Sequence, residues 1–320
     1  MKPVCFVGFD TSNYTTSAAV CTEEGKIIAN IKAPLPVKEG ECGLRQSDAV
    51  FAHVKNLPTV TQSLREAILP YDVKAVGYSA CPRQAEGSYM PCFLAGRAVA
   101  EAFAAGLQIP TVPCSHQDGH IMAAVYSCGA SEQLLKQPFV AFHVSGGTTE
   151  MLYVTPQEAS FSVELIGGTA DLNAGQAIDR VGVMMGLHFP CGREMESLAA
   201  SYTGSLPTPR ICVRDGFCNL SGLQNLAEKM WIMDQDPAKV SAYVFSFIAK
   251  TLRGMTKGCD ARFGTSIPIV YAGGVMSNRF LQGELGKREN TYFAEPQFSA
   301  DNAAGVVLIC RKRMTGQVPV

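Results

Sequence analysis

The stretch FVAFHVSGGTTEMLYVTPQEASFSVELI, residues 139–166, decides how the chain folds. It holds three apolar runs, at 139–144, 148–154 and 161–166, and the glycine turn Ser145-Gly146-Gly147 joins the first two. Apolar runs of this length between turn residues are typical of β-strands, and a tight turn makes neighbouring strands antiparallel. The second half of the chain is therefore predicted to open with three strands.

The first half of the chain opens in the same way. An apolar run at 3–9 ends at Asp10, and two further strand-like runs at 15–21 and 26–31 flank the turn Glu23-Glu24-Gly25. Helical spacing and buried-strand patterns then alternate in both halves. Helices are predicted at 47–68, 91–105, 115–126, 172–185, 194–202, 223–231, 237–259, from about 277, and 301–313, and strands at 73–78, 109–112, 267–271 and 291–293.

This repetition predicts a duplicated α/β fold of two lobes, each built as βββαβα. The first lobe comprises residues 1–131 plus 295–320 and the second comprises 132–294. We expect a cleft between the lobes, into which the tight turns of both point. The alternative is a single doubly wound parallel sheet, which hairpin openings do not suit.

Composition restricts the classes of function. The 320 residues are 47% apolar and 17% charged, with a net charge of −1, which does not favour tight, autonomous binding of nucleic acid. Twelve cysteines occur without any CxxC spacing, which excludes zinc-ribbon and thioredoxin readings and favours free thiols in a reducing compartment. The sequence shows no secretory signal and no apolar run of about 18 residues, so we expect a cytoplasmic protein without a membrane span.

The segment His116-Gln117-Asp118-Gly119-His120 places two histidines four residues apart. If Ser115 begins a helix, both imidazoles lie on one face and can bind one divalent metal. Such a pair also occurs by chance on exposed helix faces. A carboxylate would have to complete the site, and Asp301, at the start of the last predicted helix, can serve as that ligand or as a helix N-cap.

Three further segments are candidates for nucleotide binding. Glycine turns let backbone N–H groups approach phosphate oxygens, although such turns more often only connect strands or begin helices. Asp179 can hold a ribose hydroxyl or pair with a nearby cation. The segments are Val144-Ser145-Gly146-Gly147-Thr148-Thr149, the helical stretch 171–180 that contains Asp179, and Ala272-Gly273-Gly274-Val275-Met276-Ser277-Asn278.

In this order, the motifs resemble those of the TsaD family, also known as Gcp or the O-sialoglycoprotein-endopeptidase-like (glycoprotease-like) family. The resemblance covers nearly the whole chain. HQDGH at 116–120 resembles H-x-E-G-H, Ser145-Gly146-Gly147 resembles the S-G-G-H-T loop, 174–180 resembles A-G-E-A-F-D-K, Pro190-Cys191-Gly192 resembles P-G-G, 220–223 resembles F-S-G-L, Gly273-Gly274-Val275 with Asn278 resembles G-G-V-x-x-N, and 300–304 resembles T-D-N-A-A.

The resemblance implies the actin-like and sugar-kinase-like ATPase fold, abbreviated ASKHA, and transfer of a threonylcarbamoyl group from its adenylate to N6 of a tRNA adenosine. It implies one divalent metal, iron or zinc, held by His116, His120 and Asp301. It also implies that ATP or the threonylcarbamoyl-adenylate is bound by Val144, Ser145, Gly146, Gly147, Thr148, Asp179, Gly192, Gly273, Gly274 and Asn278. As partners it implies tRNA, captured together with partner subunits, and either a TsaB-like paralogue or a second copy of the chain.

The chain departs from the family pattern at several positions. The opening E-T-S-C-D-E-T becomes Asp10-Thr11-Ser12-Asn13-Tyr14-Thr15-Thr16, which removes two carboxylates. Thr148 replaces the histidine of the glycine loop, Asp118 replaces the glutamate between the histidines, and 81–90 replaces a glycine-rich segment. We therefore expect nucleotide binding with weak or altered transfer in the absence of a partner.

Three alternatives to a transferase follow from other readings of these motifs. Loss of the carboxylates favours a non-catalytic nucleotide-binding scaffold. A sugar or acid kinase is disfavoured by the histidine pair, because kinases hold Mg²⁺ through oxygen ligands. A metalloprotease is disfavoured because HQDGH lacks the glutamate of H-E-x-x-H.

Overall fold

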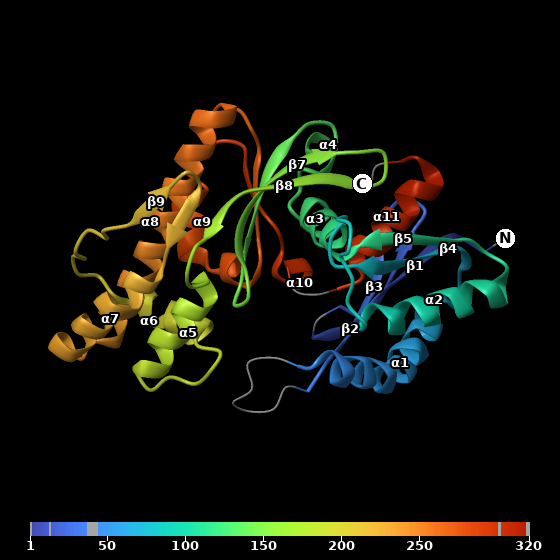
Figure 1. Cartoon of the computed structure of the whole chain (residues 1–320), viewed down its shortest axis with the longest axis horizontal. Helices are drawn as coiled ribbons and strands as arrows, with labels where there is room; N and C mark the ends of the chain where they lie inside the picture. Colours follow the sequence, from blue (N-terminus) through green and yellow to red (C-terminus); the bar gives the residue numbers. More distant parts are fainter. Residues whose placement is uncertain (1, 13, 37–43, 300–301, 318–320) are drawn as a thin grey trace. The chain divides into compact units, whose positions relative to one another are not determined.

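The computed structural model describes residues 2–12, 14–36, 44–299 and 302–317. Two compact units divide the chain (Figure 1). Unit 1 comprises Met1–Gln137, Pro156–Ser162 and Gln297–Val320, and unit 2 comprises Pro138–Thr155 and Val163–Pro296. Each unit has its own β-sheet, which confirms the predicted mixed α/β fold with two sheets rather than one.

The sheet of unit 1 has the strand order β3-β2-β1-β4-β5. Its first three strands form an antiparallel meander, because the turn after Thr22 reverses the chain as the sequence predicts. The next two strands add in parallel to β1, each after a helix. The strands are β1 (Val4–Asp10), β2 (Thr15–Thr22), β3 (Ile27–Pro34), β4 (Asp72–Cys81) and β5 (Thr111–Ser115).

Helices cover both faces of this sheet. On one face, Val7 and Phe9 of β1 form an apolar core with residues of α1 and α2. On the other face, α11 packs on β1, β4 and α3 (Figure 1). The last helix therefore belongs to unit 1. The helices are α1 (Gln46–Ile68), α2 (Phe93–Leu107), α3 (His116–Ser127), α4 (Ser131–Leu134), α10 (Pro296–Ser299, at the boundary between the units) and α11 (Ala304–Thr315).

The contact between α11 and α3 is unusually close. A Cβ atom added to Gly305 would lie only 1.8 Å from the carbonyl oxygen of Gly119. Only a pair of glycines allows two helix backbones to approach in this way. The start of α11 is thereby fixed against the helix that carries both histidines of the HQDGH segment.

The sheet of unit 2 has the strand order β12-β11-β6-β7-β8-β10-β9. The antiparallel pair β6 and β7 meets at the glycine turn that the sequence predicts, and β11 and β12 extend the sheet in parallel from β6. The strands are β6 (Phe139–Val144), β7 (Thr149–Pro156), β8 (Phe161–Thr169), β9 (Cys212–Arg214), β10 (Phe217–Asn219), β11 (Ile269–Ala272) and β12 (Thr291–Phe293).

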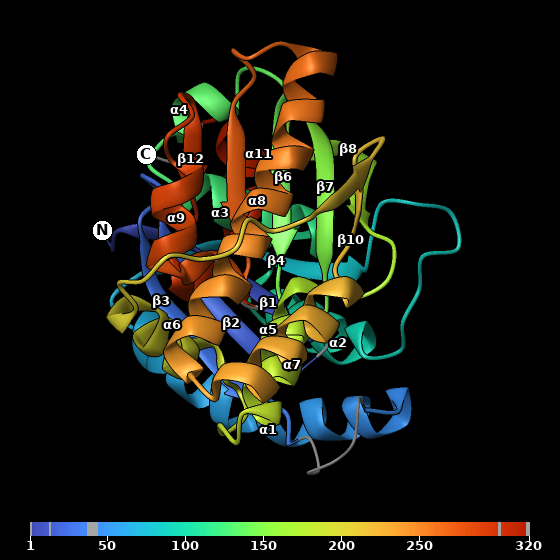
Figure 2. The same cartoon turned by 90° about the vertical axis from the view of Figure 1, so that its left-hand side faces the viewer.

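The longest helix, α8, lies against this sheet (Figure 2). Asp236 caps it by accepting hydrogen bonds from the N–H groups of Ala238 and Lys239, and the hydroxyl groups of Thr256 and Tyr271 join it to β11 at 2.7 Å. Its apolar face completes a large core with β6 and α5. The helices of unit 2 are α5 (Ala174–Met184), α6 (Gly192–Ser201), α7 (Ser221–Asp234), α8 (Pro237–Phe263), the 3₁₀ helix η1 (Gly274–Ser277) and α9 (Arg279–Leu285).

Two further expectations can be compared with the described part of the chain. The eleven described cysteines are all free, and most are buried. No helix among the described residues has the length and apolar character needed to span a membrane.

Candidate functional site

Asp10, the last residue of β1, is a buried carboxylate with three partners. Its Oδ1 accepts hydrogen bonds from the Ser79 hydroxyl at 2.6 Å and the Ser12 N–H at 2.9 Å. Its Oδ2 lies 3.0 Å from Nδ1 of His116. Burial alone would raise the pKa of Asp10, but the imidazole of His116 and these hydrogen bonds hold it below its ordinary value. Asp10 is therefore ionised and fixes the orientation of His116.

His116 and His120 lie one turn apart at the start of α3. Ser115 caps the helix by accepting a hydrogen bond from the N–H of Asp118, as its sequence position predicts. The Nε2 atoms of the two histidines are 2.9 Å apart. Because Asp10 engages Nδ1 of His116, the lone pair of that ring is available at Nε2.

The histidine pair fits a shared metal ion. Two imidazole nitrogens that bind one ion at about 2.05 Å are about 3.3 Å apart at the tetrahedral angle of zinc and about 2.9 Å apart at the angle of about 90° of an octahedral ion. The observed Nε2–Nε2 distance has the second of these values. It also fits a hydrogen bond between the rings when one nitrogen is protonated. A carboxylate holding the outer nitrogen of a ligating histidine, as Asp10 does, is a common arrangement at metal centres.

The third ligand cannot be assigned from the described residues, among which no three histidine, cysteine or acidic side chains form a metal-binding group. Asp118, between the two histidines, is turned toward Nε2 of Gln84, and burial raises its pKa. The predicted ligand Asp301 lies outside the described residues.

In unit 2, the turn between β6 and β7 is tightly closed. The Ser145 hydroxyl accepts hydrogen bonds from the N–H groups of Gly147 at 3.3 Å and Thr148 at 3.1 Å, and the Ser145 N–H donates to the carbonyl of Thr148 at 2.7 Å. Cβ atoms added to Gly146 and Gly147 would meet no atom within 4 Å. The glycine backbone is thus exposed on one side, as a phosphate-binding loop requires.

Two other predicted segments contact this turn through their backbones. The Gly175 N–H at the start of α5 donates to the Ser145 carbonyl at 3.1 Å, and a Cβ on Gly175 would lie 2.6 Å from the nitrogen of Gly146. Gly273 has φ of 101°, and a Cβ there would lie 2.2 Å from the Val144 carbonyl oxygen. The structure therefore brings together the segments around Ser145, Gly175 and Gly273. In the sequence, the first two are about 30 residues apart and the last two about 100 residues apart.

Asp179 joins α5 to the turn that precedes α6. Its Oδ1 accepts a hydrogen bond from the Cys191 N–H at 2.9 Å, and burial raises its pKa despite this bond. A Cβ added to Gly192, the first residue of α6, would meet no atom within 4 Å. One carboxylate oxygen of Asp179 is thus used to hold the turn, and the predicted contact with a ribose would fall to the other.

Asn278 combines a structural contact with a buried donor that has no partner. Its Oδ1 accepts a hydrogen bond from the Leu281 N–H at 2.9 Å and so caps α9. Asn278 is 6% exposed, and its Nδ2 makes no hydrogen bond with any residue that the structure describes. A buried amide without a partner is costly, and a bound ligand can supply the missing acceptor. Asn278 therefore fits the predicted nucleotide site.

Two residues with important contacts carry no assigned site role in the sequence prediction. One is Asp10, and the other is Asp171, whose carboxylate accepts hydrogen bonds from Leu172 N, Leu220 N, Ser221 N and Ser221 Oγ at 2.5–3.2 Å. Burial opposes its ionisation, but the hydrogen bonds from Ser221 and its neighbours hold its pKa below the ordinary value. The candidate nucleotide segment 171–180 and the resemblance motif 220–223 each contain one partner of this contact, and their joint presence was the available signal.

The two positions that replace the family's carboxylates, 14 and 15, are both described. Tyr14 is 44% exposed and Thr15 is partly buried at the start of β2, while Asn13 lies outside the described residues. Neither described side chain can supply a negative charge as aspartate or glutamate would.

The fold defines the structural class. The chain superimposes on full-length HypF in a phosphate- and nucleotide-bound form with a TM-score of 0.59 and 13% identity, over 99% of this chain and 47% of HypF. It matches the activator of 2-hydroxyisocaproyl-CoA dehydratase from Clostridium difficile with a TM-score of 0.52, 12% identity and coverage of 98% and 96%. A ROK family glucokinase from Streptomyces griseus matches with a TM-score of 0.50 and 12% identity, over 95% of this chain and 98% of the glucokinase. These identities establish the fold alone, which is the actin-like and sugar-kinase-like ASKHA architecture.

The sequence narrows this class to one family. Residues 26–307 match the profile of TsaD, tRNA N6-adenosine threonylcarbamoyltransferase. The match spans most of the 320 residues, and the chain therefore belongs to the TsaD family. The resemblance stated from the motifs is confirmed. The chain spans about half the length of HypF, so the activity of that whole protein has no direct bearing here.

Proposed function

We propose that this chain binds ATP or an acyl-adenylate on unit 2 and a divalent metal at His116 and His120, and that it transfers a threonylcarbamoyl group, or a related carbamoyl or acyl group, to a tRNA adenosine. Family membership supports the reaction class. The observation that carries the proposal is the close packing of the predicted glycine segments, with Gly175 against Gly146 and Gly273 against Val144. A turn that only connects two strands would not need these glycine segments to pack against it.

In the proposed nucleotide site, the chain supplies mainly backbone donors. The exposed backbone at Gly146 and Gly147 would face the phosphate, and Nδ2 of Asn278 would donate to the adenylate. Val144, Ser145, Thr148, Gly192 and Gly274 complete the proposed contacts, with Asp179 toward the ribose. Fixed donors of this kind stabilise charge that develops on a leaving phosphate.

In the proposed reaction, a bond forms between N6 of the adenosine and the carbonyl carbon of the transferred group. The bond from that carbon to the phosphate oxygen of the adenylate breaks, AMP leaves with the electron pair of that bond, and N6 releases one proton to solvent. A bound iron or zinc ion would supply Lewis acidity toward the developing negative charge. His116 and His120, with Asp301 as the proposed third ligand, would hold the ion, and Asp10 would orient His116.

A second candidate is a nucleotide-binding scaffold without transfer activity. It is favoured by the absence of carboxylates at 13–15, where the family pattern has Cys, Asp and Glu. A misplacement of reacting groups by about 1 Å can reduce a rate on the order of 10²-fold. Nucleotide affinity would survive this change, because the segments of unit 2 are unaffected.

We further propose that tRNA is captured with partner subunits, because the net charge of −1 offers little attraction to phosphates. The proposed partner is a TsaB-like paralogue or a second copy of this chain, in the cytoplasm. The predicted lobe boundaries, 1–131 plus 295–320 and 132–294, remain part of the proposal.

The test combines a transfer assay with a binding assay. The purified chain is incubated with threonylcarbamoyl-adenylate and unmodified tRNA, and ATP is titrated calorimetrically into the metal-loaded protein. We expect ATP binding and transfer that is weak until a partner is added. Transfer that never appears, together with intact ATP binding, would select the scaffold. Absence of ATP binding with metal present would contradict both candidates.

A further inference from the structure

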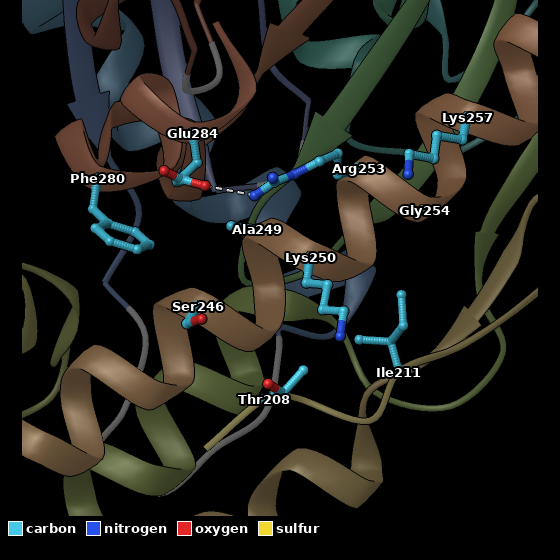
Figure 3. Close-up of a pocket in the computed structure, with 10 residues that line it drawn as sticks. All are labelled: Thr208, Ile211, Ser246, Ala249, Lys250, Arg253, Gly254, Lys257, Phe280 and Glu284. Atoms are coloured by element: carbon cyan, nitrogen blue, oxygen red, sulfur yellow. Dashed lines mark hydrogen bonds and ion pairs between the residues drawn. The ribbon is translucent and has the colours of Figure 1, made fainter. Parts of the chain in front are cut away.

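A groove with a basic end runs along α8 in unit 2, apart from the predicted nucleotide segments. Its first part has a volume of about 420 Å³. Lys250, Arg253 and Lys257 of α8 line it at helical spacing, opposite Glu284 of α9 and beside Thr208 (Figure 3). Positions 250, 253 and 257 fall on one helix face, so the three cations are gathered in one place.

The positive charge in this cavity is only partly compensated. Arg253 pairs with Glu284 at 2.5 Å, and the same Glu284 also pairs with Lys287. Lys250 donates to the backbone carbonyl of Pro209 at 2.7 Å, which satisfies a hydrogen bond without cancelling its charge. Lys257 is exposed and makes no ion pair or hydrogen bond with another described residue. The lining therefore carries an excess of positive charge that attracts an anion.

Neutral donors face the same cavity. The hydroxyl groups of Thr208 and Ser246 line it, and neither makes a hydrogen bond with another described residue. Figure 3 shows Lys250 extending toward Thr208 and Ile211, and Arg253 extending toward Glu284. Lysine and arginine donors together with hydroxyl groups are the set that binds phosphate oxygens.

A second cavity of about 670 Å³, with apolar side chains in its lining, continues the groove. The two cavities share Ile211 and Gly254. The second is lined by Met151, Ile166, Val213 and Phe263, with Asp215 and Arg262 as its charged residues. Gly258, one turn after Gly254, leaves open space, since a Cβ there would meet no atom within 4 Å.

We propose that this groove is a binding site for a small phosphate-bearing molecule with an apolar portion. The phosphate lies among Lys250, Arg253 and Lys257, and the apolar portion lies over Gly258 in the second cavity. The site is separate from the proposed transfer site, since it uses none of the residues assigned to nucleotide or metal. The proposal of this phosphate site does not depend on transfer activity, so it also holds if the chain is a nucleotide-binding scaffold.

The first test concerns the basic end of the groove. The affinity of the chain for pyrophosphate is measured by calorimetry at low ionic strength. The variant Lys250→Ala/Lys257→Ala leaves the Arg253–Glu284 pair intact. We expect its affinity to fall by about tenfold, which corresponds to about 1.4 kcal/mol. The matched control is Lys26→Ala/Lys229→Ala, which removes the same charge at two exposed lysines elsewhere. An equal loss in the control, or an unchanged affinity in the first variant, would overturn the proposal.

The second test concerns the apolar end of the groove. The affinities of the chain for 1-naphthyl phosphate and for pyrophosphate are compared. Gly258→Leu places a side chain into open space on the helix, so the fold should tolerate it. We expect it to weaken binding of 1-naphthyl phosphate and to leave pyrophosphate binding unchanged. Equal affinities of 1-naphthyl phosphate for the wild type and Gly258→Leu would contradict an apolar portion in the second cavity. A tungstate-soaked crystal with density only at the Ser145–Thr148 turn would overturn the basic site.

Discussion

The two regions with candidate chemistry are built on opposite principles. In unit 1, the proposed metal site depends on side chains that hold one another, since Asp10 contacts His116 and His116 faces His120. In unit 2, the proposed nucleotide site depends on missing side chains, because Gly175 and Gly273 let backbones approach to distances that no Cβ allows. The side-chain region should therefore lose ligand affinity without unfolding when it is altered, while the glycine region should lose stability first.

The largest expected effect is on stability, from alanine at the closest glycine contacts. Gly273→Ala would place a Cβ 2.2 Å from the Val144 carbonyl oxygen, at a φ of 101° that alanine rarely adopts. Because backbone must move to relieve the overlap, we expect the free energy of unfolding to fall by about 3 kcal/mol or more. Urea denaturation measures it, and Gly258→Ala, in open space on α8, serves as control.

The same substitution can be made at the close glycine contact of unit 1, between α11 and α3. Gly305→Ala would bring a Cβ to 1.8 Å from the Gly119 carbonyl oxygen and force α11 away from α3. We expect a comparable loss of stability, and in addition loss of metal, because α11 follows the proposed ligand Asp301. A stable Gly305→Ala protein with normal metal content would show that this helix contact does not support the histidine pair.

The second prediction concerns the metal. His120→Ala removes one proposed ligand and should abolish stoichiometric metal, while Asp10→Asn keeps both ligands and should weaken affinity by about 10–100-fold, as loss of an orienting carboxylate does. Metal content after dialysis against graded chelator measures both. His188→Ala, at an exposed histidine, is the control. Equal metal content in Asp10→Asn and wild type would contradict an orienting role.

The sequence predicts the framework well because its signals are local. The turns at Glu23-Glu24-Gly25 and Ser145-Gly146-Gly147 and the N-cap Ser115 each act within a few residues, and the structure has them where they are expected. Asp10 was missed as an orienting residue because Ser79 and His116 lie 69 and 106 residues away. The β9–β10 hairpin was missed because each strand has only three residues, too few for an alternating pattern.

The third prediction separates two roles of Asn278. Asn278→Asp keeps an oxygen that caps α9 through Leu281 N–H but replaces the unpartnered Nδ2 donor with an oxygen. We expect near-normal thermal stability and about tenfold weaker ATP binding, equivalent to loss of about one hydrogen bond to a charged group. Asn278→Ala should lose ATP affinity and about 1 kcal/mol of stability as well. If Asn278→Asp binds ATP normally, the amide has only its capping role.

The smallest expected effect concerns Asp171, which joins the start of α5 to the start of α7 in unit 2. Its pKa is held below the ordinary value of about 3.9, mainly by the Ser221 hydroxyl and neighbouring N–H donors, against the opposing effect of burial. A depressed pKa in the folded state means that ionised Asp171 stabilises the fold above about pH 4. This stabilisation is lost as the pH falls below that value and the carboxylate becomes protonated.

Asp171→Asn should therefore lower the free energy of unfolding at pH 7 by about 1 kcal/mol or less, because the carboxylate is largely exposed and its hydrogen bonds are shared with water. The difference from wild type should shrink as the pH falls from about 5 toward 3, because the unfolded chain then takes up a proton on Asp171 that the folded protein, with its lowered pKa, binds only at still lower pH. Urea denaturation across this range measures it. Asp215→Asn, at an exposed aspartate of the same unit, serves as the control. A difference that stays constant with pH would mean that Asp171 stabilises unit 2 through shape alone, which would make its role similar to that of the glycines rather than to that of Asp10.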